Sequence, residues 1–177
     1  MMQKETFQLF AQYNRWMNEK LFTASAKLSE EELRKDRGAF FGSVLGTLNH
    51  IFVGDIVWLK RFALSPHDFP SLKNLRAIPI PESLDAILFD NLDALREARQ
   101  QLDADIVRFC DELTPEQLME KLDYKNFKGD NYADQLGLLI HHLFNHQTHH
   151  RGQATTLLSQ VDIDVGPTDL LVCIRDL

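Results

Sequence analysis

Residues 136–161 read LGLLIHHLFNHQTHHRGQATTLLSQV, and their apolar side chains recur every three to four positions. This period is typical of an amphipathic helix. At about 100° per residue, most of the apolar side chains from Leu136 to Val161 fall within about 60° of Leu143. We therefore predict one long helix that ends near Val161 and turns a single apolar face toward the core.

The same period continues along most of the chain and predicts three more long helices, over about residues 5–28, 43–63 and 82–113. The helix at 43–63 contains only three Asp, Glu, Lys or Arg residues, so we expect it to lie in the interior. Four of the six prolines fall in residues 64–81, which rules out a continuous helix there. A connection of this length can run back along the helices, so the second and third helices can be parallel.

These patterns together predict an all-α fold, a four-helix bundle with a long crossover between its second and third helices. The length of 177 residues corresponds to a single domain over residues 1–177. Shorter elements are also predicted. Ser29 caps a short acidic turn, residues 114–116 begin a further helix, residues 122–132 form a turn or small hairpin, and the tail 169–177 packs on the rest.

Charge and cysteine content limit the classes of function. The chain carries 19 Lys and Arg against 26 Asp and Glu, a formal net charge of −7, and binding to nucleic-acid phosphates requires clustered basic residues. We therefore expect no nucleic-acid partner. The N-terminus lacks the apolar run of a signal peptide, and no segment is long and apolar enough to span a membrane. Cys110 and Cys173 are expected to be buried thiols, so we predict a soluble cytoplasmic protein.

Five of the seven histidines lie between His141 and His150. On the helical wheel His146 and His150 turn toward the core face, whereas the other three point away from it. Two histidines four positions apart on one face can bind one metal ion, as in the HExxH motif, although the glutamate of that motif is absent here. The alternative is that both are ordinary helical histidines whose ring nitrogens find other partners.

A catalytic zinc-like site needs three protein ligands and one open position, so a third histidine is required. His67 lies in the proline-rich connection, where we expect it to be solvated, as we do for His141. His50 lies in the second long helix, with Gly46 and Gly54 one turn away on either side. It is either a core histidine bonded to a carbonyl group or the third ligand, with small neighbours that leave room for a metal and a substrate.

Other polar residues near these histidines are candidates for supporting roles. Gln147 and Asn49 can orient the ligands from outside the site. His142 and His149 flank it, and His149 is either a general base at its edge or a solvent-facing side chain.

Asp55 is the one acidic residue in the second long helix. It falls in the main apolar arc of that helix, on the side away from His50. A carboxylate buried there needs a cationic partner. We therefore expect Asp55 to pair with an arginine, such as Arg15 or Arg151, and not to contact a metal.

The motifs YNRWMN, TLNH, DIVWL, NHQTHHRGQ and DLL begin at residues 13, 47, 55, 145 and 169. They resemble the pattern of the DinB family of metalloenzymes, and the resemblance covers nearly the whole chain. It implies a four-helix bundle with the up-down-down-up arrangement. It also implies a divalent metal, often nickel or zinc, held by His50, His146 and His150. Such proteins are frequently homodimers, and some use the metal to activate a low-molecular-weight thiol for transfer to an electrophile or for an isomerisation.

Two functions in different classes follow from the residues and the resemblance. In the first, the chain is a metal-dependent enzyme, a thiol-dependent transferase or a hydrolase, that acts on a small-molecule substrate. In the second, it is a non-catalytic metal-binding protein of a stress response, in which the ion is structural or sensory. The chain is large enough to fold without a metal, which favours the enzyme over a purely structural ion.

Overall fold

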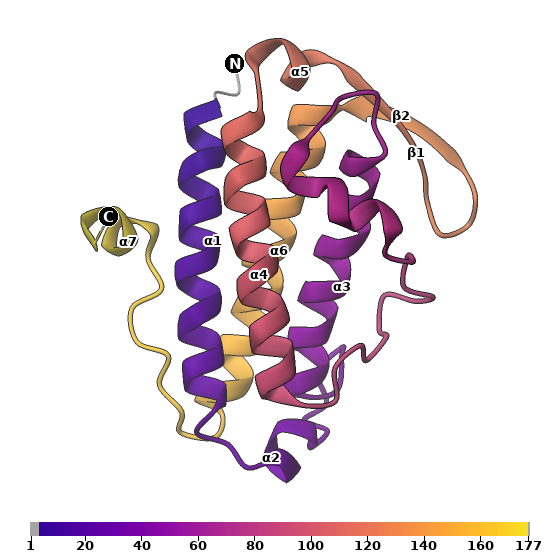
Figure 1. Ribbon diagram of the computed structural model, residues 1–177. Coiled ribbons are helices and arrows are strands. Elements are labelled where there is room, and N and C mark those ends of the chain that lie inside the picture. The colour runs from indigo at the N-terminus through magenta and orange to yellow at the C-terminus, as the bar shows by residue number, and fades with distance from the viewer. Residues whose placement is uncertain (1–3, 177) are drawn as a thin grey trace.

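The computed structural model describes residues 4–176 and is mostly helical (Figure 1). Four helices of 20 or more residues lie side by side: α1 (Lys4–Ser25), α3 (Val44–Ala63), α4 (Leu92–Glu112) and α6 (Leu136–Ser159). Helix α1 packs against α4 and α6, and α3 packs against α6. Figure 1 shows α3 and α4 running in one direction and α1 and α6 in the other, as the long connection allows.

Polar caps set the starts of two long helices. The Ser43 hydroxyl accepts the backbone N–H of Gly46 at 3.0 Å and begins α3 at the predicted position. The Asn91 side chain accepts the backbone N–H of Ala94 at 3.0 Å and begins α4. Helix α1 ends at Ser25, three residues before the predicted end, and α3 extends over nearly the whole predicted range.

The short elements include α2 (Glu30–Arg34), η1 (Pro70–Ala77), α5 (Pro115–Met119) and α7 (Leu170–Asp176). The predicted cap at Ser29 is confirmed, because its hydroxyl accepts the backbone N–H of Glu32 at 3.2 Å. The predicted helix start at residues 114–116 is also confirmed, since the Thr114 and Gln117 side chains form a capping box there. Helix α7 lies against α1.

A hairpin precedes the last long helix. Strands β1 (Lys121–Lys125) and β2 (Asn131–Gln135) pair in the antiparallel sense, with Tyr124 opposite Tyr132. The expected hairpin is therefore confirmed, but an all-α description is too narrow, because this small sheet is present. Its turn contains Gly129 at a φ of 88°, a left-handed conformation that glycine adopts without strain.

The prediction of a helix from residue 82 is wrong. Residues 82–91 are irregular, and α4 begins only at Leu92. The reason is that this segment bonds to α3 and not to itself. The backbone N–H groups of Leu88 and Phe89 donate to the Asn49 side chain at 2.9 and 3.0 Å. The connection between α3 and α4 thus continues well beyond Pro81, with the short helix η1 inside it.

The core is one cluster of aliphatic and aromatic side chains drawn mostly from the four long helices and from η1. Cys110 and Cys173 are both fully buried, as expected. Over residues 4–176, helices with the length and apolar character needed to cross a membrane are absent. The core holds α3 and α6 together along their lengths, and the histidines lie where these two helices face one another.

Candidate metal centre

His50, His146 and His150 come together between α3 and α6. The Nε2 atom of His50 lies 3.1 Å from Nε2 of His146 and 3.1 Å from Nε2 of His150. His146 and His150 are four residues apart, and this spacing puts both on one side of α6, as the helical wheel predicted. Among the described residues, no other His, Cys, Asp or Glu joins this group.

A carbonyl group fixes the orientation of the His50 ring. Its Nδ1 lies 2.7 Å from the backbone oxygen of Leu84, in the irregular segment before α4. Asn49 holds the same segment from the adjacent position on α3: its Nδ2 donates to the Phe89 oxygen at 2.9 Å, and its Oδ1 accepts two backbone N–H groups. Asn49 therefore supports His50 through the segment, without contacting the imidazole cluster itself.

The tautomers of two histidines follow from their partners. A carbonyl oxygen only accepts, so the proton of neutral His50 is on Nδ1 and its Nε2 carries a lone pair. With the Gln153 amide oriented so that its Oε1 faces Nδ1 of His150 at 2.7 Å, His150 is held in the same way. The Nδ1 atom of His146 is buried and has no hydrogen-bond partner among the described residues.

This arrangement leaves two lone pairs facing one another. The Nε2 atoms of His50 and His150 are 3.1 Å apart with no proton between them, whichever tautomer His146 adopts. A cation among the three nitrogens removes that repulsion. Nitrogen atoms bound tetrahedrally to one zinc ion at about 2.0–2.1 Å lie about 3.3 Å from one another. The cluster therefore fits a divalent ion.

Burial lowers the pKa of each imidazole. His146 is affected most, because desolvation, followed by the neighbouring His150 and His50, lowers its pKa to about 3. Desolvation is also the largest cause of the lowered pKa of His50 and of His150, while their hydrogen bonds to Leu84 and Gln153 act in the opposite direction. All three are thus neutral near pH 7, the form in which imidazole binds a metal.

Two neighbours shape the space around the cluster. A Cβ atom at Gly54 would lie 2.6 Å from Cε1 of His146, so the absence of a side chain there makes room for this ring. Phe41, in the turn before α3, stacks on His50 with ring centroids 3.6 Å apart and planes at 15°. It also meets His150 edge-on at 5.5 Å. Phe41 therefore covers one side of the cluster.

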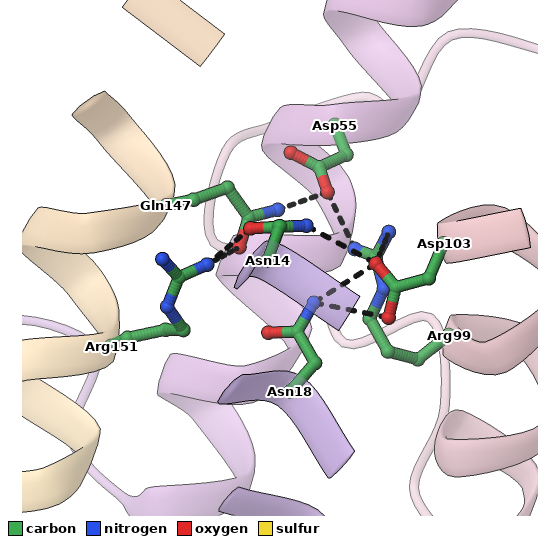
Figure 2. A network of polar contacts seen from close by, with 7 residues as sticks. All are labelled: Asn14, Asn18, Asp55, Arg99, Asp103, Gln147 and Arg151. Carbon is green, nitrogen blue, oxygen red and sulfur yellow. Dashed lines mark hydrogen bonds and ion pairs between the residues drawn. The ribbon is translucent and has the colours of Figure 1, made fainter. Parts of the chain in front are cut away.

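A network of seven buried polar side chains joins the four long helices beside the cluster (Figure 2). Its members are Asn14, Asn18, Asp55, Arg99, Asp103, Gln147 and Arg151. At its centre, Arg99 donates from Nη1 to Oδ2 of Asp55 at 2.5 Å, and its Nη2 lies 2.9 Å from Oδ1 of Asp103. Two aspartates and two arginines balance in formal charge, as buried charges must.

Asp55 pairs with an arginine, as predicted, but its partner is Arg99 and neither Arg15 nor Arg151. Arg15 is exposed, and Arg151 donates to the side-chain oxygen of Asn14. Asp55 pairs with Arg99 because the face of α3 that carries Asp55 is turned toward α4. A helical wheel shows on which face of a helix a residue lies, but it does not show which other helix packs against that face. The prediction that Asp55 points away from the histidine cluster agrees with this partner.

The predicted supporting residues have different roles. Gln147 does not reach the histidine cluster, because its side chain bonds to Asp55 and Arg151. The rings of His142 and His146 have centroids 6.1 Å apart, and those of His149 and His150 are 4.6 Å apart. His142 and His149 thus flank the cluster as expected.

Two histidines were predicted to be solvated. His141 is exposed, as expected. His67 is half-buried, with its Nε2 3.4 Å from Glu120 and its ring against Phe69, so that prediction is wrong. The proline-rich connection carries His67 onto the end of the helices, because η1 packs against α3 and α4.

Sequence reasoning missed Phe41, Leu84 and Arg99. Leu84 acts through its backbone oxygen, which no residue type specifies. Phe41 precedes the cap of α3 next to Phe40, and this aromatic pair beside a histidine-bearing helix was a usable signal. Arg99 follows the pattern of a surface residue in α4, although only 2% of it is exposed.

Comparison with known proteins is consistent with this arrangement. A sequence model of the DinB family matches residues 1–175. A protein named DinB, from Bacillus subtilis (strain 168), is 26% identical over 165 residues, which cover 92% of this chain and 90% of that protein. The family match therefore spans all three histidines of the cluster and the four long helices.

Proposed function

Because this chain belongs to the DinB family, we propose that it binds one divalent metal ion, nickel or zinc, through His50, His146 and His150. The observation that carries the proposal is the distance of 3.1 Å between Nε2 of His50 and Nε2 of His150, because each of these atoms has a lone pair that faces the other. A bound cation makes this contact favourable, whereas two neutral imidazoles in these orientations repel one another.

We further propose that the ion is catalytic, in a thiol-dependent transferase or a hydrolase that acts on a small molecule. Three protein ligands support this role, since catalytic zinc sites keep three and leave one position open, whereas structural sites use four. A divalent ion with three neutral ligands would lower the pKa of a bound water or thiol and so make it a better nucleophile near pH 7. Leu84 and Gln153 keep His50 and His150 oriented, and Phe41 excludes water from one side.

Metal analysis of purified variants tests the ligand assignment. We expect near-stoichiometric nickel or zinc in the unaltered protein and its loss in His50→Ala and in His150→Ala. His141→Ala is the matched control, because His141 is an exposed residue of the same helix α6 and should leave the metal content unchanged. Full occupancy in either ligand variant would contradict the three-histidine site.

A second candidate function is a non-catalytic one, in which the ion joins α3 to α6 as a structural or sensory element. The position of the cluster between two long helices favours it. Incubation of the loaded protein with several biological thiols and a chromogenic electrophile separates the two functions. Turnover that disappears on metal removal supports the enzyme. A large drop in melting temperature on metal removal, with no thiol effect on the spectrum of a bound nickel ion, supports the structural role.

We also infer that residues 1–177 form one domain with the four-helix bundle architecture in its up-down-down-up form. The single core shared by the long helices and the directions of α3 and α4 support this inference. The family resemblance further suggests a homodimer. Sedimentation of the purified protein would give a mass near twice 20.5 kDa for that assembly and near 20.5 kDa for a monomer.

A further inference from the structure

A large cavity lies on the opposite side of α3 from the histidine cluster. It has a volume of about 950 Å³ and is bounded by α3, α4, η1 and the irregular connection that follows η1. Phe52 and Ile56 line it from α3, and Leu102 lines it from α4. Small-molecule sites in proteins are concave, mostly apolar and about 300–1,000 Å³ in size. The cavity has these properties, and none of the three clustered histidines lines it.

The charge at its edge restricts the ligand. Among the described residues that line the cavity, none is Lys, Arg or His, and two are acidic, Glu82 and Asp105. Asp105 is paired with Arg108, and Glu82 makes no ion pair within residues 4–176. An anionic group entering the cavity would lose water without gaining a basic partner. A cationic end can pair with Glu82, and a neutral end carries no charge that must be desolvated.

The wall of this cavity also supports His50. Ser83, Ala86, Leu88 and Phe89 line the cavity, and all lie in the segment 83–89. The same segment supplies the Leu84 oxygen that binds His50, and it is tied to α3 through Asn49. A molecule that packs against the inner face of segment 83–89 stabilises the conformation of this segment in which the Leu84 oxygen binds His50.

We propose that this cavity is a second binding site, for an apolar molecule with a neutral or cationic end, and that segment 83–89 links its occupancy to metal binding. The linkage rests on the proposed function, whereas the cavity does not. Because a bound molecule stabilises the segment, it should tighten metal binding, and by reciprocity the metal should tighten the apolar ligand by the same factor.

Nile red, a neutral apolar dye, tests the cavity in the metal-free protein. We expect saturable binding of one dye per chain, followed by fluorescence. Decyltrimethylammonium and 1-decanol should displace it at concentrations roughly tenfold lower than decanoate, which has the same chain length and a negative charge. Absence of saturable binding, or displacement by decanoate at equal concentration, would overturn the site.

Variants that fill the cavity with a large side chain test whether the dye binds there. Ala98→Trp places a large side chain into the cavity from α4 and should weaken Nile red binding roughly tenfold or more. Ala133→Trp adds the same side chain at an exposed position of β2 that does not line the cavity, and it should leave binding unchanged. Ala86→Phe fills the cavity from the other wall, so it decides the matter if Ala98→Trp does not fold. Unchanged binding in a folded filling variant would overturn the location.

The linkage is measured as Zn²⁺ affinity, by competition with a fluorescent chelator, with and without saturating 1-decanol. We expect an increase of roughly fivefold or more, and the same factor in Nile red affinity when Zn²⁺ is added. Equal affinities would overturn the linkage. In His50→Ala the dye should still bind while the linkage disappears. If the unaltered protein binds no Zn²⁺, the proposed function and the linkage both fail, and the metal-free titration still decides the cavity.

Discussion

At the scale of single residues, the cluster depends on a missing side chain as much as on the imidazoles. His146 occupies the volume that a Cβ atom at position 54 would need, so Gly54 and His146 fit only as a pair. The sequence placed Gly54 one turn from His50 and indicated a need for space there. It did not indicate that the ring of His146 fills this space, because that contact joins residues of different helices.

Replacement of Gly54 by Ala tests this fit. The new methyl group would lie 2.6 Å from Cε1 of His146 and should push the ring away from His50. We expect metal affinity to fall roughly 10–100-fold, the range for residues that orient ligands. Chelator competition measures the change.

Gly152→Ala is the control for Gly54→Ala, because no described atom lies within 4 Å of the added Cβ, apart from the chain neighbours and the local backbone of α6 itself. It should keep the metal affinity and stabilise the helix by about 0.5–1 kcal/mol, since alanine has the higher helix propensity. Equal metal affinity in Gly54→Ala and the unaltered protein would show that His146 has room to move.

At the scale of helices, the buried polar network fixes how α6 is rotated against its neighbours (Figure 2). Gln147 and Arg151 each follow a clustered histidine directly in the sequence, and both side chains are bound within the network. Rotation of α6 that moved His146 and His150 out of place would also break these bonds. Asp55 holds Gln147 from α3 next to Gly54, so the network and the cluster are set by the same packing of two helices.

Removal of the central arginine should destabilise the fold strongly. Arg99→Met leaves the buried carboxylates of Asp55 and Asp103 without their cation, and the expected loss is about 3–5 kcal/mol in the free energy of unfolding. Urea unfolding followed by circular dichroism measures it. Arg96→Met, which removes a pair with Glu19 at the surface of the same helix, should cost no more than about 1 kcal/mol. Similar losses in both variants would contradict a central role for Arg99.

The helices themselves were largely predictable, because their signals are local. The apolar period, the caps at Ser29 and Ser43 and the turn at Gly129 each involve residues a few positions apart. Residues 82–91 resembled a helix for the same reason, and the bonds to Asn49 that prevent it come from about 40 positions away in the chain. Partners such as Arg99 for Asp55 are equally distant and leave no local pattern.

At the scale of the whole molecule, metal binding should raise stability without changing the fold. The long helices share one core that does not include the cluster, so the metal-free chain should remain folded. A ligand at 100 times its dissociation constant adds about 2.7 kcal/mol, which for a chain of this size corresponds to a rise of roughly 5–10 °C in Tm.

Calorimetry of the metal-free protein with and without Zn²⁺ measures this rise in Tm. The His50→Ala variant provides the reference, since it should fold but show no increase on metal addition. An increase of the same size in that variant would place the ion elsewhere on the molecule.

His50 and His146 are 96 positions apart in the chain, and this separation has a consequence for kinetics. Contacts between such distant residues form only after the intervening chain has been ordered, because closing a long loop costs entropy first. A bound ion should therefore leave the folding rate almost unchanged and slow unfolding instead. Proteases attack chains that have opened, so the supply of metal would set how long each molecule survives in the cell.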